Sequence, residues 1–330
     1  MIKFFDGGMG SMLNLAAGEL PEKLNISDPE RVFAVHDAYA KAGAQFITAN
    51  TFGANSLKYD NVDELVKAGV ALAKKAGKKV ALDLGPTGKL LKPMGDLEFE
   101  KAVELFGEVV RAGKDGSDVA IIETMSDMYE LKAAVLAVKE NSDLPIITSM
   151  IFDESGRLLT GGDVKSAVAM LEGLRVDAIG FNCGLGPKQM IPLVKELREC
   201  TSLPIIVMPN AGLPESVDGK TVYNVSPDEF ANDMKEIAEL GVSILGGCCG
   251  TTPAHIKRMI ELCKDIDDNI PEKKNDTVVC SYSTSVTIGQ KPVVIGERIN
   301  PTGKKLFKEA LRNNNICLLY TSQSPRDLST

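Results

Sequence analysis

Leu245-Gly-Gly-Cys-Cys-Gly-Thr-Thr252 ends a short apolar run and places two adjacent thiols, Cys248 and Cys249, among three glycines. Glycine lets the backbone turn sharply and approach a ligand closely, because it has no Cβ atom. A threonine cap followed by Pro253 predicts the first turn of a helix. We therefore expect both thiols to lie where a strand ends and a helix begins.

Cys183 has a similar setting, because it follows an apolar run and precedes Gly184-Leu-Gly-Pro187. Short apolar runs and longer amphipathic segments alternate in this way to about residue 264. Runs that are apolar on nearly every position indicate strands buried on both faces. Eight of them, each followed by a helical segment, predict an α/β fold of the (β/α)8 TIM-barrel type, with an open doubly wound sheet as the alternative. The predicted strands are Ile2–Phe5, Gln45–Ala49, Lys79–Leu84, Val119–Glu123, Pro145–Phe152, Ala178–Asn182, Pro204–Met208 and Ser243–Gly247.

The composition excludes several classes of protein. A net charge of −8 over 330 residues argues against nucleic acid as the main partner. No apolar run is long enough for a membrane helix, and Asp6 interrupts any signal-like segment at the N-terminus. Seven cysteines without an export signal favour reduced thiols and a cytoplasmic location, so metal binding or catalysis is more plausible than disulfides.

A (β/α)8 barrel carries its active site at the carboxyl ends of its strands. Three thiols fall there on two neighbouring strands, and this arrangement fits a catalytic zinc site with three protein ligands and an open fourth position. The predicted zinc ligands are Cys183, Cys248 and Cys249. Because a metal-bound thiol is deprotonated, the pattern indicates thiol chemistry. Further candidates at the same strand ends are Asp6, Gly7, Glu123, Asn182 and Asn210.

Each candidate also has a purely structural interpretation. A single cysteine at a strand end is usually a buried core residue. Asp6 and Glu123 could cap the helices that follow them. Asn182 and Asn210 could merely stabilise the backbone of loops. The three thiols together favour the metal site, while these alternatives stay open for the other residues.

Three motifs together resemble the homocysteine S-methyltransferase family over about residues 1–264: Asp6-Gly-Gly-Met-Gly10, Gly180-Phe-Asn-Cys183 and Gly246-Gly-Cys-Cys-Gly250. The resemblance implies a zinc barrel in which the three cysteines hold the metal and the homocysteine thiolate takes the open position. It also implies that Asp6 and Glu123 receive the amino group of homocysteine, that amides near Gly7 receive its carboxylate, and that Asn182 and Asn210 support the site.

The chain beyond residue 264 changes in character. We interpret the charged segment 265–291 as a linker, and residues 292–315 as the incomplete start of a second module. This start consists of one βα unit, with a strand predicted in the apolar run 292–303 and a helix predicted over Lys304–Arg312. Residues 316–330 continue no pattern and are interpreted as a non-native tail. Gly296-Glu-Arg-Ile-Asn-Pro-Thr-Gly303 resembles the opening of the pterin-binding module of cobalamin-dependent methionine synthases, in which Asn300 would contact the pterin.

This second resemblance implies methylcobalamin as the methyl donor, carried on a module absent from these residues, with cobalamin and folate modules as partners. Two alternatives remain. The barrel could use betaine or S-methylmethionine without cobalamin, or it could be a non-catalytic zinc-binding barrel.

Overall fold

The computed structural model describes residues 1–15, 18–217, 220–289, 291–293 and 302–315. The chain forms two compact units, residues 1–286 and 287–330. The boundary between these units falls inside the predicted linker 265–291.

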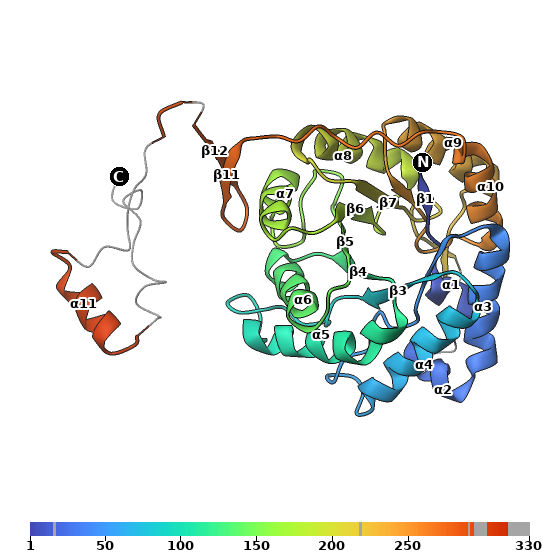
Figure 1. Cartoon of the computed structure of the whole chain (residues 1–330), viewed down its shortest axis with the longest axis horizontal. Helices are drawn as coiled ribbons and strands as arrows, with labels where there is room; N and C mark the ends of the chain where they lie inside the picture. The colour runs from blue at the N-terminus through green and yellow to red at the C-terminus, as the bar shows by residue number, and fades with distance from the viewer. Residues whose placement is uncertain (16–17, 218–219, 290, 294–301, 316–330) are drawn as a thin grey trace. The chain divides into compact units, whose positions relative to one another are not determined.

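Eight parallel strands form one sheet in the first unit, in the order β1-β10-β7-β6-β5-β4-β3-β2 (Figure 1). Every pair of neighbours is parallel, as a chain that alternates strands with helices requires. The strands are β1 (Lys3–Phe4), β2 (Phe46–Thr48), β3 (Lys79–Leu84), β4 (Val119–Met125), β5 (Ile146–Met150), β6 (Ala178–Asn182), β7 (Ile205–Met208) and β10 (Ile244–Leu245).

The two end strands of this sheet, β1 and β2, meet and close it into a barrel. A parallel bridge joins Phe5 to Phe46, and the Gln45 N–H donates to the Phe4 carbonyl at 2.8 Å. The rings of Phe5 and Phe46 also stack, with their centroids 4.7 Å apart. The predicted barrel is therefore confirmed, and the open sheet is wrong.

Helices surround the barrel and cover the outer faces of its strands (Figure 1). Several helices begin at a residue whose side chain caps the helix by accepting a backbone N–H. These cap residues are Asp28, Asp127, Asp163 and Ser226. The main helices are α3 (Pro29–Ala42), α4 (Val62–Lys75), α5 (Phe99–Gly113), α6 (Met128–Asn141), α7 (Val164–Gly173), α8 (Pro187–Cys200), α9 (Pro227–Glu239) and α10 (Pro253–Cys263). Short helical turns are α1 (Met9–Leu13), η1 (Pro21–Lys23), α2 (Leu24–Ser27) and η2 (Lys114–Gly116).

The apolar core has two layers because every barrel strand is buried on both faces. Strand β4 shows this alternation: Val119 and Ile121 belong to the cluster inside the barrel, whereas Ala120 and Ile122 belong to the cluster between strands and helices. The acids and thiols that line the pocket lie at or near the carboxyl ends of the strands.

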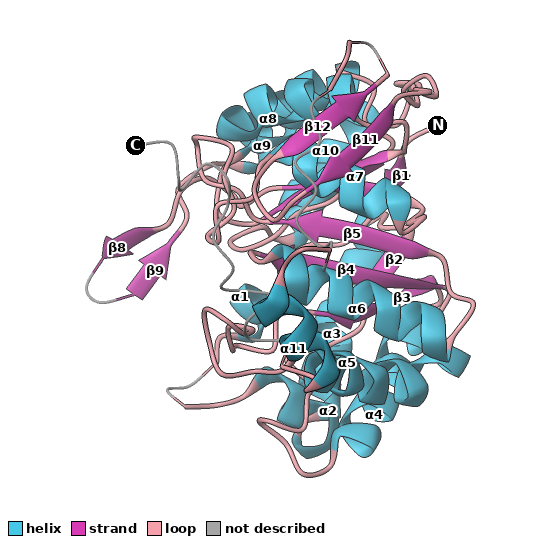
Figure 2. Cartoon of the chain, turned by 90° about the vertical axis from the view of Figure 1, so that its left-hand side faces the viewer, coloured by secondary structure: helices cyan, strands magenta, loops and turns pink. Residues whose placement is uncertain are grey.

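Two hairpins lie outside the alternating pattern and were not predicted. Strands β8 (Glu215–Val217) and β9 (Lys220–Val222) form the first, which stands apart from the barrel strands in Figure 2. Strands β11 (Thr277–Cys280) and β12 (Ser285–Ile288) form the second, inside the predicted linker.

The second unit contains α11 (Lys305–Arg312), where the sequence predicts a helix after residue 303. The strand predicted within residues 292–303, including Asn300, and the tail 316–330 fall largely or wholly outside the described residues. Within the described part of the chain, no helix is both long and apolar enough to cross a bilayer.

Candidate metal and substrate site

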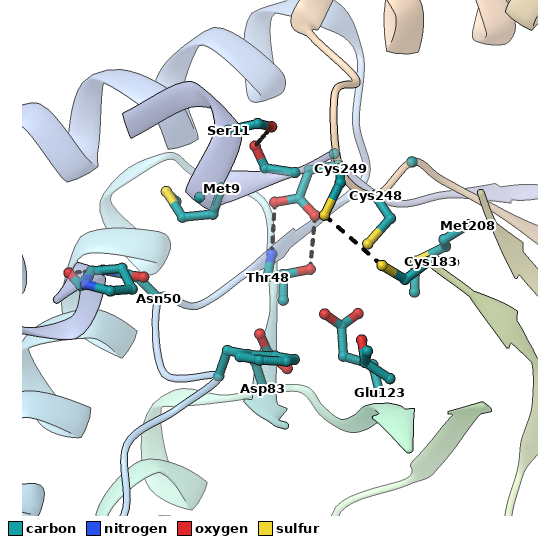
Figure 3. Close-up of a pocket in the computed structure, with 18 of the residues that line it drawn as sticks. Met9, Ser11, Thr48, Asn50, Asp83, Glu123, Cys183, Met208, Cys248 and Cys249 are labelled. Carbon is teal, nitrogen blue, oxygen red and sulfur yellow. Dashed lines mark hydrogen bonds between the residues drawn. The ribbon is translucent and has the colours of Figure 1, made fainter. Parts of the chain in front are cut away.

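A pocket of about 240 Å³ opens at the carboxyl ends of the barrel strands. Its wall brings together the three predicted metal ligands and two of the predicted acids, Asp6 and Glu123. Figure 3 shows the sulfur atoms of Cys183, Cys248 and Cys249 gathered on one side of this pocket. Among the described residues that line it there is no lysine, arginine or histidine, so the pocket is acidic.

The three thiols follow β6 and β10, which are not neighbouring strands as expected from the sequence, because β7 lies between them. Cys183 follows β6 with a φ of 58°, a left-handed conformation that turns the chain at once into Gly184, whose φ is 69°. After β10, the Cys248 N–H donates to the Pro209 carbonyl at 2.8 Å, and the Ala211 N–H donates to the Cys249 carbonyl at 3.0 Å. The loop after β7 therefore holds the cysteine pair next to Cys183.

The sulfur spacing suits a single metal ion. The three Sγ atoms lie within 4.8 Å of one another, and those of Cys183 and Cys249 are 3.9 Å apart. Two thiolates bound tetrahedrally to one zinc at about 2.3 Å are separated by about 3.8 Å. This is the one such cluster of candidate metal ligands in the described parts of the chain.

The three sulfur atoms are close enough for their ionisations to compete. Hydrogen bonds from Cys183 and Cys248 lower the pKa of the Cys249 thiol to about 3. Hydrogen bonds to Cys183 and Cys249, followed by burial, raise the pKa of Cys248 well above its usual value. A divalent cation would remove this competition, because it stabilises all three thiolates.

Asp6 follows β1 and is fixed by a neighbouring strand. Its Oδ2 accepts from the Thr48 N–H at 2.9 Å, and its Oδ1 accepts from the Thr48 hydroxyl at 2.7 Å. Burial raises the pKa of Asp6 to about 7, although these hydrogen bonds oppose the shift. No side-chain cap is formed at the start of α1, whose cap position is Gly8, so the capping interpretation of Asp6 is wrong.

Glu123 lies in an irregularity of β4, where the pairing with β5 shifts between Ile122 and Met125. Its neighbour Thr124 has a φ of 59°, so the strand bulges into the pocket. Burial, and then the charge of Asp6, raises the pKa of Glu123 to about 8. Asp127 caps the following helix instead, so Glu123 does not have the capping role.

Asn182 joins this bulge to the thiols. Its Oδ1 accepts from the Thr124 N–H at 2.8 Å and from the Ser149 hydroxyl at 2.7 Å. Its Nδ2 donates to the Thr124 hydroxyl at 2.7 Å and lies 3.8 Å from the sulfur of Cys248. The side chain therefore acts behind the pocket wall, between the metal ligands and the strand that carries Glu123.

Gly7 lines the pocket where the sequence predicts a carboxylate site. A Cβ atom here would lie 2.5 Å from the Thr251 hydroxyl and 2.8 Å from the Tyr39 hydroxyl, so a larger residue would displace both. The Thr251 hydroxyl also accepts from the Gly8 N–H at 3.1 Å. The segment after the cysteine pair thus supports the turn after β1.

Asn210 is buried, but it is not among the residues that line this pocket, although Met208, two residues earlier in the sequence, is. Neither histidine belongs to the thiol cluster. His36 is buried in α3, and His255 accepts the Thr252 N–H at 3.2 Å at the start of α10. Cys200, Cys263 and Cys280 also lie outside it.

Three residues near the thiols and acids had no predicted role: two of them, Asp83 and Glu22, line the pocket, and the third, Tyr223, contacts the cysteine pair. Asp83, at the end of β3, lies on the Glu123 side of the pocket (Figure 3). Its position as an acid at the end of a predicted strand could have identified it as a site residue from the sequence. Glu22 lies in η1 and accepts from the Gly53 N–H and the Tyr59 hydroxyl, both at 2.6 Å. Tyr223 hydrogen-bonds to Cys249 and packs on Gly250, which has no Cβ to obstruct the ring.

Comparisons with known proteins agree with this geometry. The sequence profile described as "Homocysteine S-methyltransferase" matches residues 3–263. Methionine synthases from Mycobacterium leprae and Mycobacterium tuberculosis are each 32% identical to this chain. The alignments cover 93% and 98% of the chain, but 28% and 30% of those proteins. The chain thus spans less than a third of the length of these relatives.

The fold is similar to that of the homocysteine methyltransferase MmuM from Escherichia coli. Its metallated form superimposes with a TM-score of 0.66 at 23% identity, over 78% of this chain and 95% of that one. Its apo form gives a TM-score of 0.63 at 25% identity, over 79% and 95%.

Proposed function

The chain belongs to the homocysteine S-methyltransferase family, and from this premise we propose that it transfers a methyl group to the sulfur of homocysteine, giving methionine. The observation that carries the proposal is the shared pocket, in which a cluster of three thiols faces two acids, the buried Asp6 and the half-buried Glu123. A thiol substrate with an ammonium group needs both a site for its sulfur and a negative partner for its amine.

The donor set fits zinc. Three converging thiolates match its preferred ligands, and the described residues offer no fourth histidine, cysteine or carboxylate within the cluster, so one position is left for a substrate. Cys183, Cys248 and Cys249 would hold the metal, which when bound keeps the substrate thiol ionised at neutral pH.

The chain's own residues would orient homocysteine. Glu123 and Asp6 line the pocket and would pair with the ammonium group, and backbone N–H groups near Gly7 would receive the carboxylate. Asn182 would keep the Glu123 bulge and the Cys248 sulfur in a fixed relation. The substrate sulfur attacks the methyl group, the S–CH3 bond forms, and the electron pair of the broken bond leaves with the donor.

The proposed donor is methylcobalamin, which would leave as cob(I)alamin, with the methyl group derived ultimately from 5-methyltetrahydrofolate. The support is the similarity to two methionine synthases, together with the motif at residues 296–303. The cobalamin and folate modules would be partners of this barrel in a longer enzyme.

Donor dependence tests this proposal. The zinc-loaded chain is incubated with homocysteine and, separately, methylcobalamin, betaine or S-methylmethionine, and methionine is measured. We expect methionine to form only when methylcobalamin is the donor. Formation only with betaine or S-methylmethionine would overturn the donor, and no methionine with any donor, together with no binding of homocysteine, would support a non-catalytic zinc barrel.

A further inference from the structure

Asp83 is a buried acid, and one of its carboxylate oxygens has no hydrogen-bond partner among the described residues. It lines the pocket with Asp6 and Glu123 and is 5% exposed. Its Oδ1 atom is buried and accepts no hydrogen bond from the residues that the structure describes. Such groups are uncommon in folded proteins, because desolvation without a hydrogen bond costs stability.

The backbone around Asp83 is nevertheless held firmly. The Thr51 hydroxyl donates to the Asp83 carbonyl at 2.8 Å and accepts its N–H at 3.2 Å. The backbone that carries the carboxylate is therefore held at the pocket, at the end of β3, by the segment that follows β2. Its position does not result from a loose chain.

The electrostatic surroundings of Asp83 are unfavourable to a carboxylate. Burial, followed by the charges of Glu123, Asp6 and Glu22, raises the pKa of Asp83 well above its usual value. No cationic side chain lines the described part of the pocket. A cation supplied by a ligand would relieve both the repulsion and the missing hydrogen bond.

We propose that Asp83 is a third carboxylate partner of the substrate's ammonium group, beside Asp6 and Glu123, and that it makes the pocket selective for thiols carrying a cationic amine. This inference rests on the proposed binding of homocysteine. Both oxygens of Asp6 already accept from Thr48, whereas an ammonium group has three N–H donors to place. The Oδ1 atom of Asp83 supplies an acceptor that no donor in the described part of the chain uses.

The test is isothermal titration calorimetry on the zinc-loaded chain and on its Asp83→Asn variant. Two ligands are compared: homocysteine, and 4-mercaptobutanoate, which has the same thiol and carboxylate but no amine. We expect Asp83→Asn to raise the Kd of homocysteine at least tenfold. The Kd of 4-mercaptobutanoate should stay the same or fall, because the substitution removes only a negative charge. Equal weakening of both ligands, or unchanged binding of homocysteine, would overturn the role of Asp83.

Thermal unfolding separates this role from a structural one. Because the pKa of Asp83 is raised in the folded chain, its ionisation destabilises the fold progressively as pH rises above about 4. Asp83→Asn should therefore raise the Tm at pH 8, whereas loss of a structural carboxylate would lower it. Glu22→Gln is the matched control, because the Glu22 carboxylate accepts hydrogen bonds from two protein donors. The Tm of this variant should fall, and the Kd values of the two ligands should change by the same factor.

The two proposals fail in distinguishable ways. If the unmodified, zinc-loaded chain does not bind homocysteine, the proposed function fails, and the inference about Asp83 fails with it. If the unmodified chain binds homocysteine and Asp83→Asn binds it equally well, only the inference about Asp83 fails.

Discussion

At the scale of single residues, Glu123 shows what its proposed binding role would cost in stability. The side chain is half-buried in the pocket that Asp6 also lines, and its pKa is raised to about 8. A fold without a ligand gains nothing from this arrangement, since two acids repel in a pocket of low polarity. A ligand cation reverses the balance, because it pairs with the charge that the fold disfavours.

Glu123→Gln should weaken homocysteine binding by about 2–5 kcal/mol, the usual range when one partner of a buried charged pair is removed. The zinc content should not change, because Glu123 is outside the thiol cluster. Calorimetry and metal analysis of the same sample check both statements. Loss of zinc, or equal weakening of 4-mercaptobutanoate, would place Glu123 in the metal site or in the fold.

Cys248→Ala should release zinc during dialysis against a chelator, because two thiolates hold a divalent ion far less well than three. Cys263→Ala is the matched control, since Cys263 is a buried thiol at the end of α10, outside the cluster. It should lose stability and keep one zinc per chain. A Cys248→Ala chain that retained a full equivalent of zinc would contradict the assigned ligands.

His36 gives stability a pH dependence that is independent of the site. Burial without a hydrogen-bond partner lowers its pKa from 6.5 to about 4. Between these values the unfolded chain binds a proton and the folded chain does not. The titration of His36 therefore leaves the free energy of unfolding unchanged above pH 6.5 and lowers it as the pH falls from 6.5 towards 4.

His36→Leu should accordingly flatten the loss of unfolding free energy between pH 6.5 and pH 4, by on the order of 1–3 kcal/mol. Denaturant unfolding at pH 5 and at pH 7.5 measures this. An identical effect of the substitution at both pH values would show that His36 does not titrate in the unfolding reaction.

At the scale of secondary structure, the bulge in β4 is the element that unites the two halves of the site. Asn182, at the end of β6, holds Thr124 through its backbone and its hydroxyl, while Ser149 of β5 fixes the orientation of the amide. Three neighbouring strands are thus joined across the pocket wall. This contact is specified by side chains and not by the pattern of the barrel.

Asn182→Ala should raise KM for homocysteine about tenfold or more, because the bulge loses the acceptor that holds the Thr124 N–H. Ser149→Ala should have a smaller effect in the same direction, since Asn182 keeps its contacts with Thr124. Restoring the amide one methylene further out, in Asn182→Gln, should recover little. KM values with unchanged zinc content check the series, and equal effects of Ser149→Ala and Asn182→Ala would contradict the order.

The same scale shows why the sequence predicted some elements and not others. The run Ala178–Asn182 matches β6 because both of its faces are buried, so every position before the terminal Asn182 is apolar or small. The hairpin of β11 and β12 was missed because its residues are mostly exposed, and no burial pattern is imposed on them. Asp83 was visible as a strand-end acid, whereas Glu22 follows no strand and carries no such signal.

At the scale of the whole first unit, the segment after α10 closes the amino ends of the barrel strands. Asp268 and Ile270 line a cavity there together with Lys3 and Ile147, and Asp268 pairs with the amino group of Met1. The first ten residues of the predicted linker are therefore held against the barrel.

The fastening depends on two side chains. Arg198 donates to the Asn269 carbonyl at 2.8 Å. Lys274 donates to the carbonyls of Arg198 and Thr201, at 3.2 and 2.9 Å, and its N–H donates to the Ser202 hydroxyl at 2.9 Å. The hairpin that follows has a separate anchor, because the Tyr282 hydroxyl donates to Asp127 at 2.5 Å, at the start of α6.

Chains ending at residues 264, 274 and 288 separate these contributions. The step from 264 to 274 restores several hydrogen bonds, each worth about 1 kcal/mol, and should raise the Tm by on the order of 5–10 °C. The step from 274 to 288 adds mainly the Tyr282 anchor and should raise it by a few degrees. Differential scanning calorimetry measures both steps, and Lys274→Met in the 274 chain should remove much of the first. All three chains should keep one zinc, because the thiols lie at the other end of the barrel from this segment. If the chain ending at residue 264 were as stable as the chain ending at residue 274, residues 265–274 would contact the barrel without stabilising it.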